Sequence, residues 1–280
     1  MNDAPLVTVI VPTYNSAKTI ERCLASIRHQ THPSIEVILV DGGSTDDTVS
    51  VASRFNVQVH VCPGMGRTAA TNHGIRHSRG QYVYRIDSDV VLDSKLVKEC
   101  VSTCSKKGAD ALCIVWTPDP NISFWAKVRK LENDCYANNP FPRGARFFPR
   151  EVIIAVGCFD PALVSGEDYD VYNKLVRHGF RLDTIRSRET HIGEPQHIVD
   201  VFRKQYAYGK TMRAFLKASQ RVGIVQMWPF KSALLKNWKA FARHPVLTVG
   251  FVVYEIVYYA GGLLGIAVSA AHATSQHELT

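Results

Sequence analysis

The chain has 280 residues, 46% of them hydrophobic, which is enough for one large domain or for a domain with an appendage. Its formal net charge of +8 fits partners such as phosphate-bearing substrates, nucleic acid or an anionic membrane surface. The seven cysteines are odd in number and include no C-x-x-C pair, which argues against a zinc finger and a secreted disulfide framework and favours buried free thiols. No basic stretch followed by an apolar run opens the sequence, so we expect no signal peptide and a cytoplasmic catalytic part.

The first part of the chain alternates between apolar strands and short amphipathic helices. Strands are expected over residues 6–11, 35–40 and 57–61, and each is followed by a helical pattern. This alternation predicts an α/β fold with a mainly parallel sheet and helices on both faces. No G-x-G-x-x-G follows the first strand and no P-loop is present, so a simple dinucleotide domain or NTPase is disfavoured.

Residues 82–90 carry the clearest chemistry. A strand runs directly into Asp87 and Asp89, and carboxylates at this spacing point to one side where a strand gives way to a loop. Such a pair can hold a hard divalent cation, and ligands of α/β sheets collect outside the carboxyl ends of the strands. We therefore expect a diphosphate-holding site here, although D-x-D alone is a weak signal because surface carboxylates are usually solvated.

Alternating helices and strands continue to about residue 191, with a last strand expected from Arg181 to about Ile185, and the composition then changes near Pro195. From residue 197 to 244, ten lysines and arginines oppose a single acid, Asp200. One side of this segment is apolar, which suits an interfacial helix on an anionic leaflet; that side is formed by Ile198, Phe202, Tyr206 and Phe215.

Residues 246–270 are long and apolar enough for a transmembrane helix, since they would span about 37 Å against a hydrocarbon core of ~30 Å. Glu255 opposes insertion by roughly 3 kcal/mol, but twelve Leu, Ile, Val and Phe residues return roughly 4 to 7 kcal/mol. The alternative is a buried helix of a soluble core. No Lys or Arg follows Arg243, so the positive-inside rule places the preceding domain in the cytoplasm. We expect a catalytic domain over residues 1–195, basic interfacial helices over 196–244, and a transmembrane helix with a short tail over 245–280.

Six short motifs occur in a characteristic order along the chain, namely Val9–Asn15, Val40–Thr48, Gly66–Gly74, Asp87-Ser-Asp89, Gly157–Asp160 and Gly166–Asp168. Together they closely resemble the family 2 glycosyltransferases. The resemblance implies a GT-A fold, the α/β sandwich of nucleotide-diphospho-sugar transferases, with a mainly parallel sheet. The tail from Gln205 to Lys210 resembles the membrane-bound branch of cellulose-synthase-like and polyprenol-linked sugar transferases. It departs from the Gln-x-x-Arg-Trp pattern of cellulose synthases, because Tyr208, Gly209 and Lys210 stand there instead.

The resemblance implies a set of nucleotide-binding residues, which are Pro12, Thr13, Tyr14, Asp41, Arg67, Asp87 and Ser88. In this scheme Tyr14 stacks on the base, Asp41 accepts a hydrogen bond from it, and Arg67 reaches the nucleotide. The resemblance also implies that Mn²⁺ or Mg²⁺ is held by Asp87 and Asp89, with His191 as a third ligand. From the residues alone, Asp41 could instead shape a turn, Tyr14 could be a packed aromatic, and His191 an ordinary polar histidine.

An inverting transfer needs a carboxylate that removes the proton of the acceptor hydroxyl. The resemblance implies that this general base is Asp168, the Asp of the Glu167-Asp168 pair. On the sequence alone it could equally be a helix-dipole partner, and Glu167 or Asp170 could exchange roles with it. Glu167, Gln205 and Tyr208 are the expected acceptor contacts.

These features predict a non-processive, inverting, metal-dependent hexosyltransferase that moves one sugar from a nucleotide sugar to a lipid-linked (polyprenol) acceptor at the cytoplasmic membrane face. GDP-mannose is the first choice of donor, and UDP-glucose is close behind it. A membrane-anchored, non-enzymatic nucleotide-sugar-binding protein is the alternative of another class. A sugar nucleotidyltransferase would need a Gly-rich basic loop after the first strand, which is missing. We expect no nucleic-acid partner and do not exclude a homo-oligomer.

Overall fold

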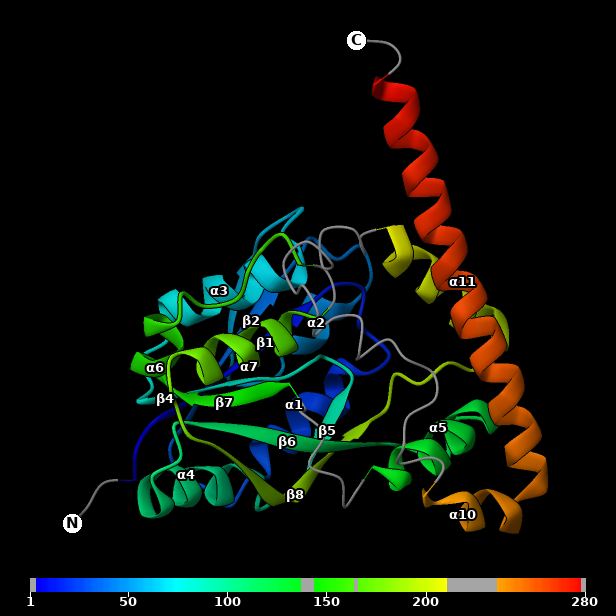
Figure 1. The fold of residues 1–280 in the computed structure, drawn as a ribbon. Helices are drawn as coiled ribbons and strands as arrows, with labels where there is room; N and C mark the ends of the chain where they lie inside the picture. Colours follow the sequence, from blue (N-terminus) through cyan, green and yellow to red (C-terminus); the bar gives the residue numbers. More distant parts are fainter. Residues whose placement is uncertain (1–3, 137–143, 164–165, 211–235, 278–280) are drawn as a thin grey trace. The chain divides into compact units, whose positions relative to one another are not determined.

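The computed structural model describes residues 4–136, 144–163, 166–210 and 236–277, with side chains up to residue 269. The chain divides into two compact units (Figure 1). The first unit consists of Met1–Trp116, Pro142–Ala162 and Gly166–Gly193, and the second of Thr117–Phe141, Leu163–Ser165 and Glu194–Thr280.

The first unit is built on a sheet that has eight strands within the described residues, in the order β3-β2-β1-β4-β7-β6-β8-β5. The strands are β1 (Val7–Thr13), β2 (Ile35–Asp41), β3 (Gln58–Val61), β4 (Tyr82–Arg85), β5 (Val90–Leu92), β6 (Ala111–Pro118), β7 (Ala145–Pro149) and β8 (Leu182–His191). The first four strands pair in parallel, whereas β7 is antiparallel to both β4 and β6, and β5 is antiparallel to β8. The expected α/β fold is confirmed, and the parallel part of the sheet consists of β3, β2, β1 and β4.

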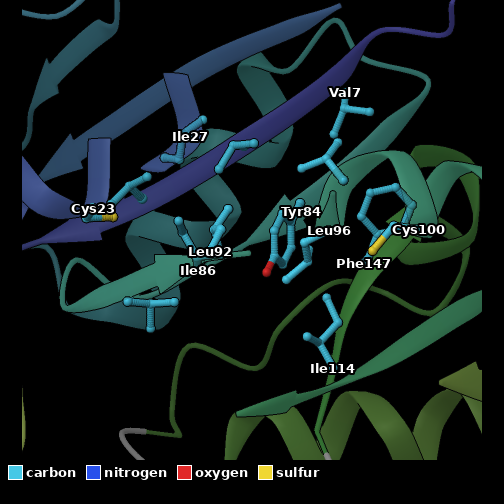
Figure 2. Close-up of a cluster of buried hydrophobic side chains, with 14 of the residues drawn as sticks. Val7, Cys23, Ile27, Tyr84, Ile86, Leu92, Leu96, Cys100, Ile114 and Phe147 are labelled. Carbon is cyan, nitrogen blue, oxygen red and sulfur yellow. The ribbon is translucent and has the colours of Figure 1, made fainter. Parts of the chain in front are cut away.

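Helices of the first unit cover both faces of this sheet (Figure 1). They are α1 (Ile20–Arg28), α2 (Thr48–Ala52), α3 (Arg67–His77), α4 (Leu96–Lys107), α6 (Arg150–Ala155) and α7 (Glu167–Arg177). Successive residues of a strand point to opposite faces, so Val9 packs with α1, α2 and α4 while Ile10 packs with α3, α6 and α7. Figure 2 shows the first of these clusters, in which Tyr84 and Phe147 lie among side chains from α1 and α4.

β8 is longer than the sequence predicts, because it continues to His191 where the expected strand ended near Ile185. Its last three residues pair with β5 in register, with His191 opposite Val90. The cross-strand partner is distant in sequence, so periodicity within residues 181–191 could not reveal this extension.

The second unit contains α5 (Phe124–Cys135), α10 (Trp238–Arg243), α11 (Pro245–His277) and a helical segment over residues 198–210. α5 falls within residues 1–195, the range expected for the catalytic domain, but it belongs to the second unit, where its buried Val128 packs with Val201 and Tyr254. Ile198, a residue of the expected interfacial face, packs against the same cluster and is partly buried by protein. Phe215, the last residue of the expected interfacial face, lies outside the described residues.

Glycines allow α11 to approach the helix of residues 198–210 closely. A Cβ atom added at Gly261 would meet the Phe202 carbonyl oxygen at 2.7 Å, and one added at Gly265 would overlap the Tyr206 carbonyl oxygen. Small residues spaced four apart on an apolar helix permit backbone contact of this kind. The pair is therefore packed through backbone atoms, and a side chain at either glycine would force the two helices apart.

α11 also contains the one candidate membrane span found in the described residues, Pro245–Ser269, with a mean hydropathy of 1.7. Length and composition alone support this assignment. Only 17% of its most apolar 18-residue stretch is buried inside the protein. A row of its large apolar side chains is exposed, namely Val246, Val249, Val252, Val253, Ile256, Leu263 and Leu264.

Gly74 tests how tightly α3 packs on the sheet, since a Cβ at this position would lie 2.5 Å from Cγ2 of Ile10. Gly74→Ala gains about 1 kcal/mol of helix propensity but should lose about 1 to 3 kcal/mol through overpacking, so we expect net destabilisation. In an Ile10→Ala background the clash is absent, and the same substitution should stabilise the protein. Denaturant unfolding of the four proteins in this cycle measures the difference, and an equal effect of Gly74→Ala in both backgrounds would contradict the packing argument.

Candidate functional site

The predicted site residues gather at the carboxyl edge of the parallel strands. Thr13 at the end of β1 lies opposite Asp41 at the end of β2, and Arg85 at the end of β4 pairs with Ile10 of β1. Because the carboxyl ends of neighbouring parallel strands meet at one edge, Asp41 and the chain that follows Arg85 lie on the same side of the sheet.

Asp41 is fully buried and shapes the turn that follows β2. Its Oδ1 accepts hydrogen bonds from the backbone N–H groups of Gly43 (3.0 Å) and Ser44 (2.7 Å), and its Oδ2 accepts one from the Thr13 hydroxyl at 3.0 Å. The turn fixes the loop beside Tyr14, whose side chain is 62% exposed and therefore open to a stacking partner. Pro12 and Thr13 are buried beneath this loop, and a contact of Asp41 with a nucleotide base stays a prediction.

A buried arginine holds the acidic residues of the site together. Arg85 is 1% exposed, and its Nη2 lies 2.8 Å from Asp87 Oδ1 and 3.2 Å from Glu167 Oε1. Its Nη1 lies 3.3 Å from Asp168 Oδ1, whereas its buried Nε has no hydrogen-bond partner among the described atoms. A single guanidinium therefore links the D-x-D segment after β4 to the first turn of α7.

A second arginine extends this network. Arg146 on β7 lies 3.3 Å from Asp87, 3.2 Å from Asp168 and 2.9 Å from the fully buried Glu189 of β8. The Tyr84 hydroxyl donates a hydrogen bond of 2.7 Å to the other oxygen of Glu189. The network therefore joins strands β4, β7 and β8.

Arg67, the first residue of α3, closes the network on its exposed side. Its Nη2 lies 2.7 Å from Glu167 Oε1, and its Nη1 lies 3.7 Å from Asp87 Oδ1. Arg67 therefore lies beside the D-x-D segment and pairs with carboxylates, and its contact with a nucleotide stays a prediction.

Burial and neighbouring charges shift the pKa values of the carboxyl groups in this network. Burial alone would raise the pKa of Asp87, but the surrounding guanidinium groups outweigh that effect and hold its pKa well below the usual range. Burial, together with the adjacent Asp168 carboxylate, raises the pKa of Glu167, and burial raises that of Glu189. Among the described residues, these acids and Asp168 are paired with three guanidinium groups, those of Arg67, Arg85 and Arg146.

Asp89 lies beside this network and faces His191, with 3.4 Å between its Oδ1 and the imidazole Nε2. The β5–β8 ladder sets this approach, since His191 pairs with Val90 and the N–H of Ile192 donates to the Asp89 carbonyl at 2.8 Å. A Cβ at Gly193 would overlap the Asp89 carboxyl group, so the close passage of the chain here requires glycine. Asp89 remains 27% exposed, which leaves its carboxylate open to a ligand.

Two smaller contacts complete the site. Ser88 lies 2.8 Å from Ser16 through their hydroxyl groups, which connects the D-x-D loop to the segment after β1. Gly144 lies directly against Asp168, and an added Cβ would overlap that side chain. Asp168 is 17% exposed, so its carboxylate has a surface that a second molecule can reach.

A sequence profile described as Glycosyl transferase family 2 matches residues 8–165, more than half of the chain. The chain belongs to glycosyl transferase family 2. This result confirms the family and the enzyme class expected from the motifs.

Several family 2 relatives are similar over part or most of the chain. The glycosyltransferase AglE of Haloferax volcanii is 27% identical over 263 residues, which cover 89% of this chain and 82% of AglE. The hyaluronan synthase of Pasteurella multocida is 31% identical over 44% of the chain, and the chondroitin synthase of Escherichia coli is 35% identical over 62% of it. The chain spans only 13% and 27% of the length of these two synthases.

Solved structures share the fold at low sequence identity. The mannosyltransferase PcManGT from Pyrobaculum calidifontis, solved with GDP-Man and Mn²⁺, has a TM-score of 0.58 and 21% identity, covering 99% of this chain and 81% of its own. TarS residues 1–349 from S. aureus, solved with UDP-GlcNAc, has a TM-score of 0.53 and 17% identity, covering 96% and 92% of the two chains. These similarities confirm the GT-A architecture.

The family 2 motifs predicted part of the site and missed the residues that hold it together. The structure brings Arg67, Asp87, Asp168 and Glu167 into one network, with Asp89 and His191 adjacent. Gln205 and Tyr208 belong to the second unit, and their acceptor role stays a prediction. Arg85, Arg146 and Glu189 were not among the predicted site residues. A signal for Arg85 exists in the sequence, because a charged residue in an apolar strand such as Tyr82–Arg85 indicates a buried charged partner.

Replacing Arg85 should destabilise the protein because three carboxylates lose their shared partner. We expect Arg85→Met to reduce the free energy of unfolding by about 3 to 5 kcal/mol, as does breaking other buried ion pairs. Arg79→Met is the matched control, since Arg79 pairs with Glu36 at 2.9 Å but is 72% exposed; its loss should cost no more than about 1 kcal/mol. Denaturant unfolding followed by circular dichroism measures both, and equal losses would contradict the central role of Arg85.

Proposed function

We propose that the protein is an inverting, metal-dependent hexosyltransferase that uses a nucleotide sugar and a lipid-linked acceptor at the cytoplasmic face of a membrane. The observation that carries this proposal is the convergence of Asp87, Asp89 and Asp168 at the carboxyl edge of one sheet. Inverting transfer uses two separate functions, charge neutralisation at the departing diphosphate and a carboxylate base for the acceptor. The first unit supplies candidates for both, and we propose that it is the catalytic part.

The residues around Asp89 fit a divalent ion of the Mn²⁺ or Mg²⁺ class. Carboxylate oxygens suit both ions, and the nearby His191 imidazole supplies a donor that Mn²⁺ accepts. We propose Asp87, Asp89 and His191 as the residues that would hold this ion. When bound, such an ion would neutralise charge on the diphosphate leaving group.

The protein's own residues then have distinct tasks. Tyr14 offers an exposed ring for stacking on the base. We propose that Ser88, within the D-x-D segment, and Arg67, which pairs with Asp87, contact the nucleotide. The two arginines that pair with Asp168 fix the position of its carboxylate, which would accept the proton of the acceptor hydroxyl. Gly144 leaves room for that carboxylate.

For the donor we take GDP-mannose, with UDP-glucose as the alternative. PcManGT, the neighbour solved with GDP-Man and Mn²⁺, covers nearly the whole chain and supports the first choice. TarS, solved with UDP-GlcNAc, supports a uridine donor with comparable coverage. Thermal shift measurements with GDP- and UDP-sugars, each with and without Mn²⁺, separate the two donors.

Membrane attachment through α11 supports a lipid-linked acceptor. The exposed apolar row along Pro245–Ser269 provides a surface that suits lipid, whereas Tyr254 and Val257 turn toward α5. Glu255 is only partly exposed, which lowers the cost of a carboxylate within the span. We propose that Gln205 and Tyr208, on the helix packed against α11, contact this acceptor.

Asp168→Asn should lower kcat for sugar transfer by about 10²- to 10⁴-fold while leaving the KM for the donor nearly unchanged, because the amide cannot accept the proton. Asp170→Asn is the matched control: Asp170 lies in the same helical turn, pairs with Lys174 at 2.8 Å, and should be dispensable for transfer. Steady-state transfer assays on the detergent-purified chain measure both. Full activity in Asp168→Asn, or loss only in Asp170→Asn, would show that the base is wrongly assigned, and nucleotide binding without any turnover would favour the non-enzymatic alternative.

Gly193→Ala should weaken metal-dependent nucleotide binding, because the new methyl group would displace the Asp89 carboxylate. Gly262→Ala is the matched control, since a Cβ at Gly262 meets nothing within 4 Å. Calorimetric titration with GDP and UDP in the presence and absence of Mn²⁺ gives the dependence on metal. Unchanged metal dependence in Gly193→Ala would argue against Asp89 as a ligand.

A further inference from the structure

Three histidines form a cluster away from the acidic site. His60 lies on β3, and His73 and His77 are one turn apart on α3. Each of the three residues contributes one ring nitrogen, and these three nitrogens all lie within 4.8 Å of one another. His73 and His77 stack with ring centroids 4.2 Å apart, and His60 meets both rings nearly edge-on.

The ring nitrogens in this cluster point toward one another. Nδ1 of His60 lies 2.8 Å from Nε2 of His73, a separation at which the two nitrogens share one proton. Nδ1 of His77 lies 2.8 Å from the His73 carbonyl oxygen, and since a carbonyl only accepts, this nitrogen carries the proton. Nε2 of His77 is therefore the nitrogen with a free lone pair. Histidine ligands of metals commonly use their second N–H in the same way, to donate to a backbone carbonyl.

Solvent access and donor type both suit a metal ion. His60 and His73 are partly exposed and His77 is exposed, so an ion can reach all three from solvent. Imidazole donors suit Zn²⁺, Ni²⁺ and Cu²⁺, whereas carboxylates suit Mg²⁺ and Mn²⁺.

We propose that His60, His73 and His77 form a binding site for one divalent transition-metal ion of the Zn²⁺ or Ni²⁺ class. For both facing nitrogens of His60 and His73 to bind the ion, the proton between them would move to the far ring nitrogen of the histidine that carries it, so both rings stay neutral. With Nε2 of His77 as third ligand, a fourth position remains for water. His73 and His77 lie roughly 9 and 15 Å along α3 from Arg67, the residue that contacts the acidic network. The histidine site is therefore distinct from the Asp89 centre in both place and donor chemistry.

An ion at this position would fasten β3 to α3. β3 is an edge strand that pairs with β2 alone among the described residues, so it lacks a second strand to hold it. Residues 62–66 connect it to Arg67, and the N–H groups of Cys62 and Gly64 donate to the carbonyls of Asp41 and Gly42. The ion would tie the strand that precedes this connection to α3, the helix that follows it, and the connection itself passes close to Gly42 beside Tyr14.

The test uses the full chain without a histidine tag, purified in detergent, stripped with EDTA and titrated with Zn²⁺ in a calorimeter. His77→Gln and His60→Gln should each weaken binding at least about tenfold, since even indirect contacts to a metal ligand are worth that much. Asp89→Asn should leave this binding unchanged and so separates the two sites. His178→Gln is the matched control. Nδ1 of His178 also lies 2.8 Å from a carbonyl oxygen four residues earlier, that of Lys174, and its ring stacks on Phe180. Among the described residues, His178 belongs to no group of potential metal ligands.

A folding measurement accompanies the titration. Zn²⁺ should raise the melting temperature of the wild-type and His178→Gln proteins but not that of His77→Gln, while all three should melt alike in EDTA. If His60→Gln fails to fold, His77→Gln decides alone, because His77 is exposed. Absence of Zn²⁺ binding by the wild-type chain, or affinity in His77→Gln equal to that of the wild type, would overturn the proposal.

Discussion

The site depends on a positive charge that is almost completely removed from water. The Arg85 side chain is 1% exposed, and it persists there only because carboxylates from the D-x-D segment and from α7 surround it. A buried ion pair of this kind contributes little net stability compared with apolar packing, but loss of either partner is costly. The network therefore specifies the relative positions of β4 and α7, and the candidate base takes its position from that constraint.

The same network explains why strands β7 and β8 belong to the site. Arg146 and Glu189 arrive on antiparallel strands added to the parallel half of the sheet, and Tyr84 links them back to β4. The β5–β8 pairing then places His191 beside Asp89. The parallel strands form the edge on which the D-x-D segment lies, and the antiparallel strands β7 and β8 contribute Arg146, Glu189 and His191 beside it.

The sequence alone predicted the fold class, the family and most acids of the site, because these rest on local signals. Alternating strands and helices predict the sheet, and motifs such as Asp87-Ser-Asp89 occupy strand ends. Contacts between distant strands were not predictable in this way. The pairing of Arg146 with Glu189, and the extension of β8 to His191, depend on register between segments far apart in the chain. Gly144 and Gly193 were missed because their role is to leave space beside a carboxylate, which no local pattern records.

The assignment of α5 to the second unit has a consequence for dividing the protein. α5 lies in sequence between β6 and β7, yet its apolar face packs with Val201 and Tyr254. The chain thus leaves the first unit after Trp116 and returns to it at Pro142, so a single cut cannot separate the two units. A fragment ending at residue 195 would keep α5 but lose the cover for Val128, and the uncovered apolar surface would promote self-association.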